Sequence, residues 1–459
     1  MSNIQSVNFP NHSKSFDDVT AGALEVKDIP LALYIHIPWC VKKCPYCDFN
    51  SHELPIDTQL SMYAEYVDAL LLDANMQQAL TQGREIASIF IGGGTPSLLP
   101  IDQYQRLFSG LRNIFRFAED IEVTMEANPG TLEHAPFAQY LDVGINRLSI
   151  GVQSFAADKL KTLGRIHDPD QALMAIQAAR AAGFKRVNVD LMHGLPQQTM
   201  NEALTDIQMA HDAGATHISW YQLTIEPNTV FYRSQPILPD EDNLADIEQA
   251  GQALLEQLGY SNYEVSAWAG TSDRPCRHNI NYWQFGDYLA IGAGAHGKVT
   301  IGHTSLKTDK DTSILLEKHE GLESSLSTET GIYRFSKSRL PKDYMFNNDM
   351  FKDDTSTDVT STNTNTNTNY GRKSNAPKMV GWQKIASDEL VSEFMLNVLR
   401  LHGGVDWSLF ETRTGLNYDE IAVQVDKLIA QGLLIDSDEQ LQPTALGQRY
   451  LNQILREFL

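Results

Sequence analysis

Apolar runs rich in β-branched residues alternate with helical patterns through the first half of the chain. Six such runs occur, at Leu31–Ile37, Ser88–Ile91, Ile121–Met125, Arg147–Val152, Val187–Met192 and His217–Leu223. Helical patterns lie between them, for example at Thr58–Leu80, Asp102–Phe115, Pro169–Ala182 and Thr199–Ala213. This alternation predicts βαβ units and a parallel sheet. Six units are too few for a closed eight-stranded barrel, so we predict an α/β fold with a partial (β/α)6 barrel. Its chemistry should lie at the carboxyl ends of the strands.

The predicted helices carry signals at their ends. Asp102 and Thr199 have side chains that cap helix N-termini, and Gly183 and Gly214 are typical of helix C-termini. A further helix is predicted at about Asp240–Leu258, before a stretch rich in glycine and aromatic residues.

Composition divides the rest of the chain. We expect an N-terminal tail at 1–30, a core at 31–300, polar insertions at 301–385 and a helical domain at 386–459. Within the insertions, 351–375 contain a Thr-Asn repeat with no apolar residue to bury, which predicts disorder.

The last segment predicts a small helical domain. One apolar stripe comprises Leu390, Phe394, Val398 and Leu401, and another comprises Ile421, Val425, Leu428 and Ile429. Short runs at Leu433–Ile435 and Gln440–Gln442 predict a hairpin, and Thr444 is placed to cap a last helix. This order is similar to a winged helix, for which we expect a docking or lid role.

Charge and hydropathy narrow the function classes. The formal net charge is −22, which repels polyanions and argues against a nucleic acid partner. No stretch approaches the roughly 18 apolar residues that span a bilayer. The first residues, MSNIQSVNFPNHSKSFDD, lack the basic start and apolar run of a secretory signal. We therefore expect a cytoplasmic protein.

Three of the four cysteines form a C-x₃-C-x₂-C loop directly after the first predicted strand. They are Cys40, Cys44 and Cys47. Three thiolates on one loop can hold three corners of a [4Fe–4S] cluster, which leaves the fourth iron open to a ligand. The amine and carboxylate of a methionine can chelate that iron. The alternatives are zinc, with Cys276 or a histidine as fourth ligand, and a purely structural cluster, although the paired spacings typical of zinc are absent.

The cysteine loop, together with two later motifs, resembles the HemN-type branch of the radical S-adenosylmethionine (SAM) superfamily. Those motifs are Gly92-Gly-Gly-Thr-Pro-Ser97 and Met125-Glu-Ala-Asn-Pro129. The branch contains oxygen-independent coproporphyrinogen III oxidase and the HemW heme chaperones. The resemblance covers roughly 31–303 and 380–459. It implies a radical SAM core, a [4Fe–4S] cluster on the three cysteines and SAM as cofactor.

The resemblance also implies two sets of SAM-binding residues. The first set comprises Tyr34, Gly93 and Glu126. The second set, which holds a second SAM in the oxidase, comprises Tyr46, Gly94, Thr95, Gln153, Arg165 and Asp190. Taken alone, the glycine run is also consistent with a tight βα turn. Glu126 alone is also consistent with a helix cap.

Two departures from the oxidase pattern favour a heme chaperone without oxidase activity. The oxidase carries another cysteine two residues after the third ligand, where this chain has Phe49. The tail before the first strand is also shorter than in the oxidase.

The segment His278-Asn-Ile-Asn-Tyr282-Trp283 favours the same branch, because it matches the H-N-x-x-Y-W signature of the chaperones. His278 is then a candidate axial ligand of heme iron, with Cys276 as its rival. The alternative is that this segment only knits a loop and fills the core. The resemblance implies heme and heme-accepting proteins as partners, membrane-bound respiratory enzymes among them. It also implies a homodimer and a peripheral location at the membrane during delivery.

Overall fold

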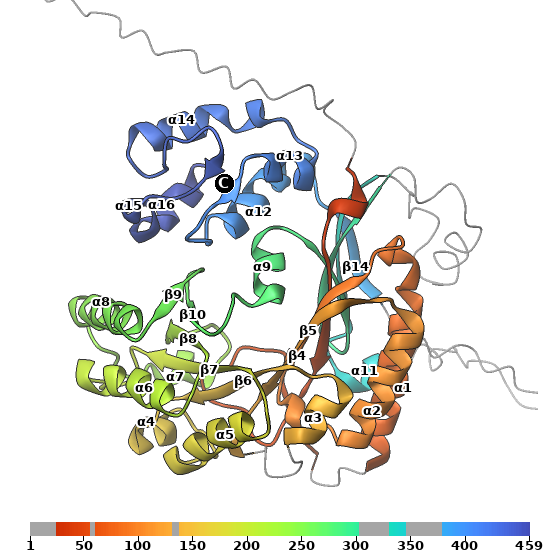
Figure 1. Cartoon of the computed structure of the whole chain (residues 1–459), viewed down its shortest axis with the longest axis vertical. Helices are drawn as coiled ribbons and strands as arrows, with labels where there is room; N and C mark the ends of the chain where they lie inside the picture. The colour runs from red at the N-terminus through yellow and green to blue at the C-terminus, as the bar shows by residue number, and fades with distance from the viewer. Residues whose placement is uncertain (1–23, 56–59, 131–136, 303–329, 346–378) are drawn as a thin grey trace, which may run out of the picture.

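The computed structural model describes residues 24–55, 60–130, 137–302, 330–345 and 379–459. All six predicted strands form, and they lie side by side and parallel in chain order. They are β1 (Leu31–Ile37), β4 (Ile86–Gly93), β5 (Phe117–Ala127), β6 (Arg147–Gln153), β7 (Arg186–His193) and β8 (His217–Gln222). The sheet curves around an interior without closing (Figure 1). The predicted partial barrel is thereby confirmed.

Helices cover the outer face of the curved sheet (Figure 1). They are α1 (Leu60–Met76), α2 (Ile101–Ile114), α3 (Phe137–Val143), α5 (Pro169–Ala181), α6 (Met200–Asp212) and α8 (Glu241–Gln257). Shorter helices, α4 (Ala157–Thr162) and α7 (Val230–Ser234), follow β6 and β8. Successive strand residues point to opposite faces. In β5, Val123 and Met125 therefore join the apolar core under the helices, and Glu122 and Glu126 face the interior.

The helix ends agree with the sequence at three of four positions. Thr199 caps α6 by accepting a hydrogen bond from the Glu202 amide. Gly183 and Gly214 follow α5 and α6 with φ of 106° and 98°, the left-handed conformation common after helices. The prediction for Asp102 was wrong. Pro100 is the N-cap of α2, and Asp102 lies in its first turn, where a negative charge faces the positive end of the helix dipole.

The sheet extends beyond the six strands on both sides, which the sequence did not predict. Next to β1 lies the parallel β11 (Asp287–Ile291), followed by antiparallel β12 (His296–Ile301), β13 (Gly331–Lys337) and β14 (Met379–Lys384). Beyond β8 lie β10 (Ala267–Gly270) and β9 (Tyr260–Asn262). β13, α11 (Pro341–Met345) and β14 fall within 301–385, where only polar insertions were expected. The predicted disorder at 351–375 lies outside the described residues.

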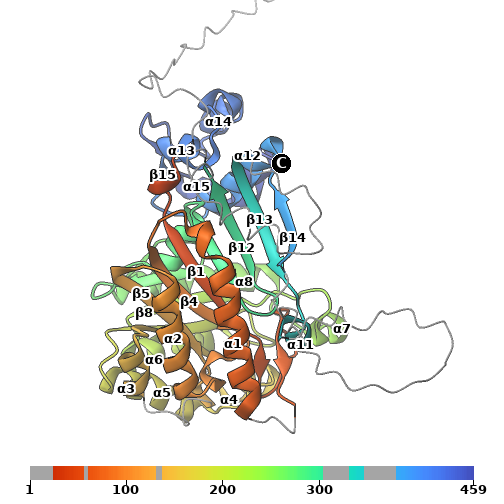
Figure 2. The ribbon, with the colours of Figure 1, turned by 90° about the vertical axis from the view of Figure 1, so that its right-hand side faces the viewer.

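A helical domain at the C-terminus sits against the extended edge of the sheet (Figure 2). Its elements are α12 (Ser387–Val398), β15 (Val405–Asp406), α13 (Ser408–Thr414), α14 (Ala422–Ala430), β16 (Gln440–Leu441), α15 (Ala445–Arg449) and α16 (Leu451–Arg456). Both predicted apolar stripes contribute to one buried cluster. Thr444 caps α15 as predicted. In place of the full predicted hairpin, a bridge joins Leu434 to Pro443, and β16 pairs with β15.

Between the sheet and this domain lies α9 (Arg277–Trp283) (Figure 1). Ile280 and Trp283 pack against the apolar cluster of the C-terminal domain. The guanidinium of Arg400 lies 5.3 Å from the centre of the Trp283 ring. None of the described helices is long and apolar enough to cross a membrane.

A buried carboxylate holds β11 within the sheet. Asp287 is fully buried and accepts hydrogen bonds from Arg84 at 2.7 Å and from Lys298 at 3.1 Å. It also accepts from the amide of Thr300 at 2.9 Å. Burial opposes ionisation of Asp287, but the charges of Lys298 and Arg84 outweigh it and hold the pKa of the carboxyl below its usual value. The carboxylate is thus ionised and paired at neutral pH.

Replacing Asp287 by Asn should lower the free energy of unfolding by about 3–5 kcal/mol, because two buried cations lose their partner. Urea denaturation followed by circular dichroism measures this change. The matched control is Glu457→Gln, which breaks the exposed pair with Lys427 and should cost no more than about 1 kcal/mol. Since the folded pKa of Asp287 is depressed, its contribution is present above the unfolded pKa of about 3.9 and is lost as pH falls through the folded pKa. Equal stability of the two variants would contradict this account.

Candidate functional site

A cavity of about 480 Å³ opens at the carboxyl ends of the parallel strands. Eleven of the thirteen residues proposed from the sequence line it. They are Cys40, Cys44, Tyr46, Cys47, Gly93, Gly94, Thr95, Glu126, Gln153, Arg165 and Asp190. Side chains that are far apart in the chain therefore meet around one space. Its volume lies within the range of about 300–1,000 Å³ typical of ligand pockets.

The cysteine loop forms one wall of the cavity. Cys40 ends β2 (Trp39–Cys40), which pairs with β3 (His52–Glu53). A turn brings the Cys47 amide within 3.2 Å of the Cys44 carbonyl. All four cysteines of the chain are free thiols. Burial raises the pKa of Cys40 and of Cys47, so both are thiols in the absence of a metal.

The structure separates Cys276 from the cysteine loop. Cys276, the suggested fourth zinc ligand, is buried and donates to Glu122 at 3.3 Å. Glu122 precedes Glu126 by four residues on β5, about 13 Å at the usual rise per residue. Cys276 therefore lies at the other end of the interior from the loop.

The glycine run joins the cysteine loop to the strand ends. A Cβ atom on Gly93, whose φ is 113°, would lie 2.5 Å from the ring of His36. His36 donates to the Asn50 carbonyl at 2.9 Å, which leaves its other ring nitrogen to accept from the Tyr34 hydroxyl at 3.0 Å. Glycine is thus required where β4 meets β1. Gly93 leaves room for the His36 ring, which donates to the carbonyl of Asn50 just after the last cysteine of the loop.

Glu126 lies where its charge is sensitive to a ligand. Its Oε2 accepts a hydrogen bond from the Gly93 amide at 3.1 Å. Burial, with a further contribution from the neighbouring Asp190, raises the pKa of Glu126 to about 7. A cationic ligand would favour the ionised carboxylate.

Of the second set of predicted residues, Tyr46 lies in the cysteine loop, and Gly94 and Thr95 follow β4. Gln153 ends β6, Arg165 follows α4 and Asp190 lies on β7. Gln153 has φ of 72°, unusual for a residue other than glycine, and accepts from the Tyr221 hydroxyl at 2.8 Å. Arg165 donates to the Asn128 side chain, to the Gly151 carbonyl and, at 3.7 Å, to the Cys44 sulfur. This arginine therefore connects the strand ends to a predicted cluster ligand.

Asp190 is held inside the cavity by neighbouring polar groups. It accepts from the Ser149 hydroxyl at 3.0 Å and from the Asn188 amide at 2.8 Å. Burial raises its pKa. Because burial removes this carboxylate from solvent, a polar or cationic ligand can supply the interactions that water would otherwise provide.

The two remaining predicted residues, Tyr34 and His278, lie behind the cavity wall. The His278 ring on α9 lies 5.0 Å from that of Phe90, which lines the cavity, and 6.5 Å from that of Tyr34. Its Nδ1 is buried and has no hydrogen-bond partner among the described residues. Burial lowers the pKa of His278 to about 4, so the ring is neutral at physiological pH.

Comparisons with known proteins agree over nearly the whole chain. Residues 34–210 match the Radical SAM superfamily, and residues 385–450 match the HemN C-terminal domain. The heme chaperone HemW of Escherichia coli is 43% identical over 434 residues, 95% of this chain and 99% of the relative. That of Haemophilus influenzae is 41% identical over 94% of this chain and 98% of the relative. The chain belongs to the HemW family of heme chaperones.

A solved structure supports the fold of this HemW family member. Coproporphyrinogen III oxidase (HemN) from E. coli, a radical SAM enzyme, has a TM-score of 0.69 at 22% identity. The match covers 94% of this chain and 90% of that one. At this identity the likeness is one of fold.

Several cavity residues of this HemW family chain were not identified from the sequence. They are Phe90, Arg147, Ser149, Asn188, Ser219, Tyr221, Ser266 and Asn279. The period of two along the strands could have found the ones on β6 and β7. Arg147 and Ser149 share a face with Gln153, and Asn188 shares one with Asp190.

Replacing Glu126 by Gln should weaken SAM binding at least tenfold, because a charged buried hydrogen bond contributes about 1.5–3 kcal/mol. Titration calorimetry on anaerobically reconstituted protein measures the affinity, and iron content should stay unchanged. Glu119→Gln, at an exposed position of the same strand, is the matched control. The sulfonium of SAM favours ionised Glu126, so wild-type affinity should rise with pH between about 6 and 7.5, and the Gln variant should be insensitive. A wild-type affinity independent of pH would remove Glu126 from the site.

Proposed function

We propose that this protein binds heme together with a SAM-coordinated [4Fe–4S] cluster and delivers the heme to acceptor proteins. The observation that carries the proposal is the 43% identity to the E. coli heme chaperone, which extends over 99% of that protein. Acceptors would include membrane-bound respiratory enzymes. The protein would work in the cytoplasm as a homodimer and approach the membrane only for delivery.

Cys40, Cys44 and Cys47 would each bind one iron of the cluster. Their placement on one wall of a ligand-sized cavity and their free thiols fit this role. Binding would release protons, because Cys40 and Cys47 are thiols before the metal arrives. When bound, the cluster would supply an electron and an open iron position for SAM.

The residues around the cluster site would hold SAM. Glu126, oriented by the Gly93 amide, would face the positive charge of the ligand. The second set, from Gln153 to Asp190, lines the same space and suits a further polar ligand. Arg165, near the Cys44 sulfur, would stabilise the negative charge of the thiolate.

The alternative function, oxidative decarboxylation of coproporphyrinogen III, lacks support at one position. Phe49 replaces the additional cysteine of the oxidase pattern, lines the mouth of the cavity and is 63% exposed. A phenyl ring can neither ligate iron nor exchange a proton.

Of the two heme-ligand candidates, His278 suits iron better than Cys276. Neutral imidazole is the form that ligates iron, and the depressed pKa of His278 keeps it neutral. The Cys276 thiol is engaged with Glu122, and burial raises its pKa to about 11. Since the His278 ring lies against Phe90 on the inner side of α9, ligation would require the iron at the centre of the porphyrin to come within bonding distance of this ring.

His278→Ala should shift the absorption maximum of bound heme and weaken its binding, with iron–sulfur content unchanged. Cys276→Ala should leave the heme spectrum as in the wild type. Heme titration followed by absorption spectroscopy compares the two variants. Wild-type spectra for both would place the heme ligand elsewhere.

The proposed function is tested on anaerobically reconstituted wild-type protein. We expect about four irons per chain, heme binding, and no conversion of coproporphyrinogen III in the presence of SAM and a reductant. A Cys40/Cys44/Cys47→Ala triple variant should lose the iron–sulfur absorbance. Turnover of coproporphyrinogen III to protoporphyrinogen IX would replace the chaperone proposal by the oxidase.

A further inference from the structure

Arg147 is a buried cation without a hydrogen-bond partner. It is the first residue of β6, its side chain faces the cavity, and it is 2% exposed. Its guanidinium makes no hydrogen bond with any residue that the structure describes, and its Nε is fully buried. An arginine carries five N–H donors, and a buried donor that has no partner destabilises the folded chain. Such a side chain can donate its unused hydrogen bonds to a bound ligand.

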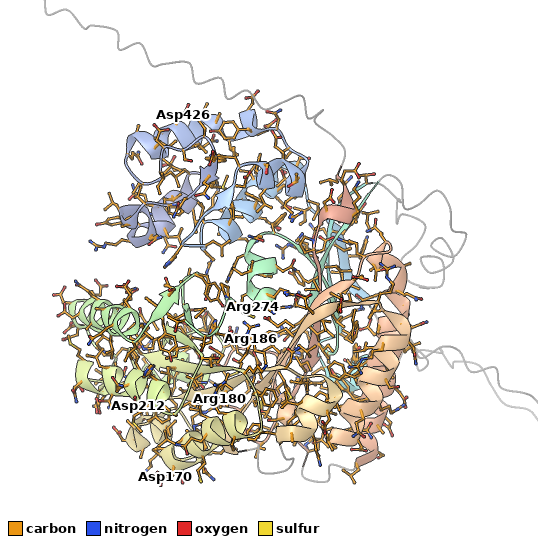
Figure 3. All side chains as sticks on the ribbon, in the orientation of Figure 1. Asp170, Arg180, Arg186, Asp212, Arg274 and Asp426 are labelled. Atoms are coloured by element: carbon orange, nitrogen blue, oxygen red, sulfur yellow. The ribbon has the colours of Figure 1, made fainter. Side chains whose placement is uncertain are left out.

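The carboxylates near Arg147 are already engaged with other groups. Glu122 pairs with Arg186 and accepts from the Cys276 thiol and the Arg277 amide. Asp273 pairs with the same Arg186 and accepts from a threonine hydroxyl. Arg186 also donates to the carbonyls of Arg274 and Pro275, just before α9 (Figure 3). No carboxylate of the described chain forms an ion pair with Arg147.

Asp190, which is in register with Gly151 and so lies nearer the carboxyl ends of the strands, accepts from a serine and an asparagine side chain. Burial raises the pKa of Asp190. The charges of Glu122 and Asp273 act on Arg147, but neither carboxylate forms a hydrogen bond with it. The part of the cavity around Arg147 therefore contains a guanidinium whose N–H donors no described residue accepts.

The position of Arg147 separates it from the cluster end of the cavity. Gln153 ends the same strand six residues later, about 20 Å away at the usual rise per residue. A ligand chelated next to the cysteine loop occupies the upper part of the cavity. The floor combines Arg147 with the aromatic ring of Phe90 and the polar side chains of Asn188, Ser219 and Asn279.

We propose that Arg147 binds a carboxylate of a second ligand below the SAM site, and that this carboxylate is a propionate of heme. The inference rests on the proposed function. Guanidinium and carboxylate form paired hydrogen bonds of matching geometry. The His278 ring lies 5.0 Å from that of Phe90, and Phe90 is in register, through Thr124, with Arg147. His278 and Arg147 therefore lie at the same level of the sheet. A porphyrin that bound beside His278 would be close enough for one propionate to pair with Arg147.

The experiment compares heme with heme dimethyl ester, in which both propionates are blocked. Wild-type protein, anaerobically reconstituted, should bind heme at least tenfold more tightly than the ester. Arg147→Gln should lower heme affinity to that of the ester and leave ester affinity unchanged. Arg147→Lys, which keeps the charge, should restore part of the difference. The matched control is Arg274→Gln, at an exposed arginine near α9 (Figure 3), which should behave as wild type.

A parallel SAM titration identifies the source of the carboxylate. SAM affinity should be equal in wild type and Arg147→Gln. A tenfold loss for SAM with unchanged heme binding would assign Arg147 to the SAM carboxylate and overturn the inference. If the wild type binds heme and the ester equally well, the inference about Arg147 is overturned, whereas the proposed function of heme binding still stands. Wild-type protein that binds neither porphyrin would instead refute the proposed function.

Discussion

The two-faced character of the parallel strands is the constraint on which the rest of this structure depends. On β5, Val123 and Met125 point outward to the helices, and Glu122 and Glu126 point inward. The outward residues supply the apolar core. The inward face is thereby free to carry charges, whose desolvation is offset by neighbours on adjacent strands. Alternate residues of each strand thus form the apolar core and line the interior. A shift of one residue in the strand register would exchange the two sets.

At the carboxyl ends of the strands, this arrangement is linked to the cysteine loop by a few short-range contacts. His36 touches Gly93 on one side and bonds to the Asn50 carbonyl on the other. Asn50 in turn donates to the Arg339 carbonyl at 2.8 Å, in the segment after β13. The loop that carries the candidate cluster ligands is therefore supported by both the barrel and the sheet extension. A rigid supporting layer of this kind holds ligands in place before a cofactor binds.

The parts of the fold that depend on local pattern were predictable, and the parts that depend on distant pairing were not. All six parallel strands and the caps at Thr199 and Thr444 follow from periodicity and residue type. β13 and β14 lie far apart in the chain and on either side of residues 346–378, and their pairing has no local signal. In the site, motif residues such as Glu126 were found. Arg147 belongs to no motif, so only the period of two along β6 could have placed it on the face of Gln153, and its lack of a partner is seen only in the folded interior.

The short helix α9 has a mechanical consequence. It is 7 residues long, about two turns, and it carries His278 at one end and Trp283 at the other. His278 contacts Phe90 of the cavity wall, and Trp283 packs on the C-terminal domain under Arg400. A helix this short transmits displacement as a rigid lever. A displacement of the C-terminal domain at Trp283 would therefore reach His278 and the cavity wall at Phe90.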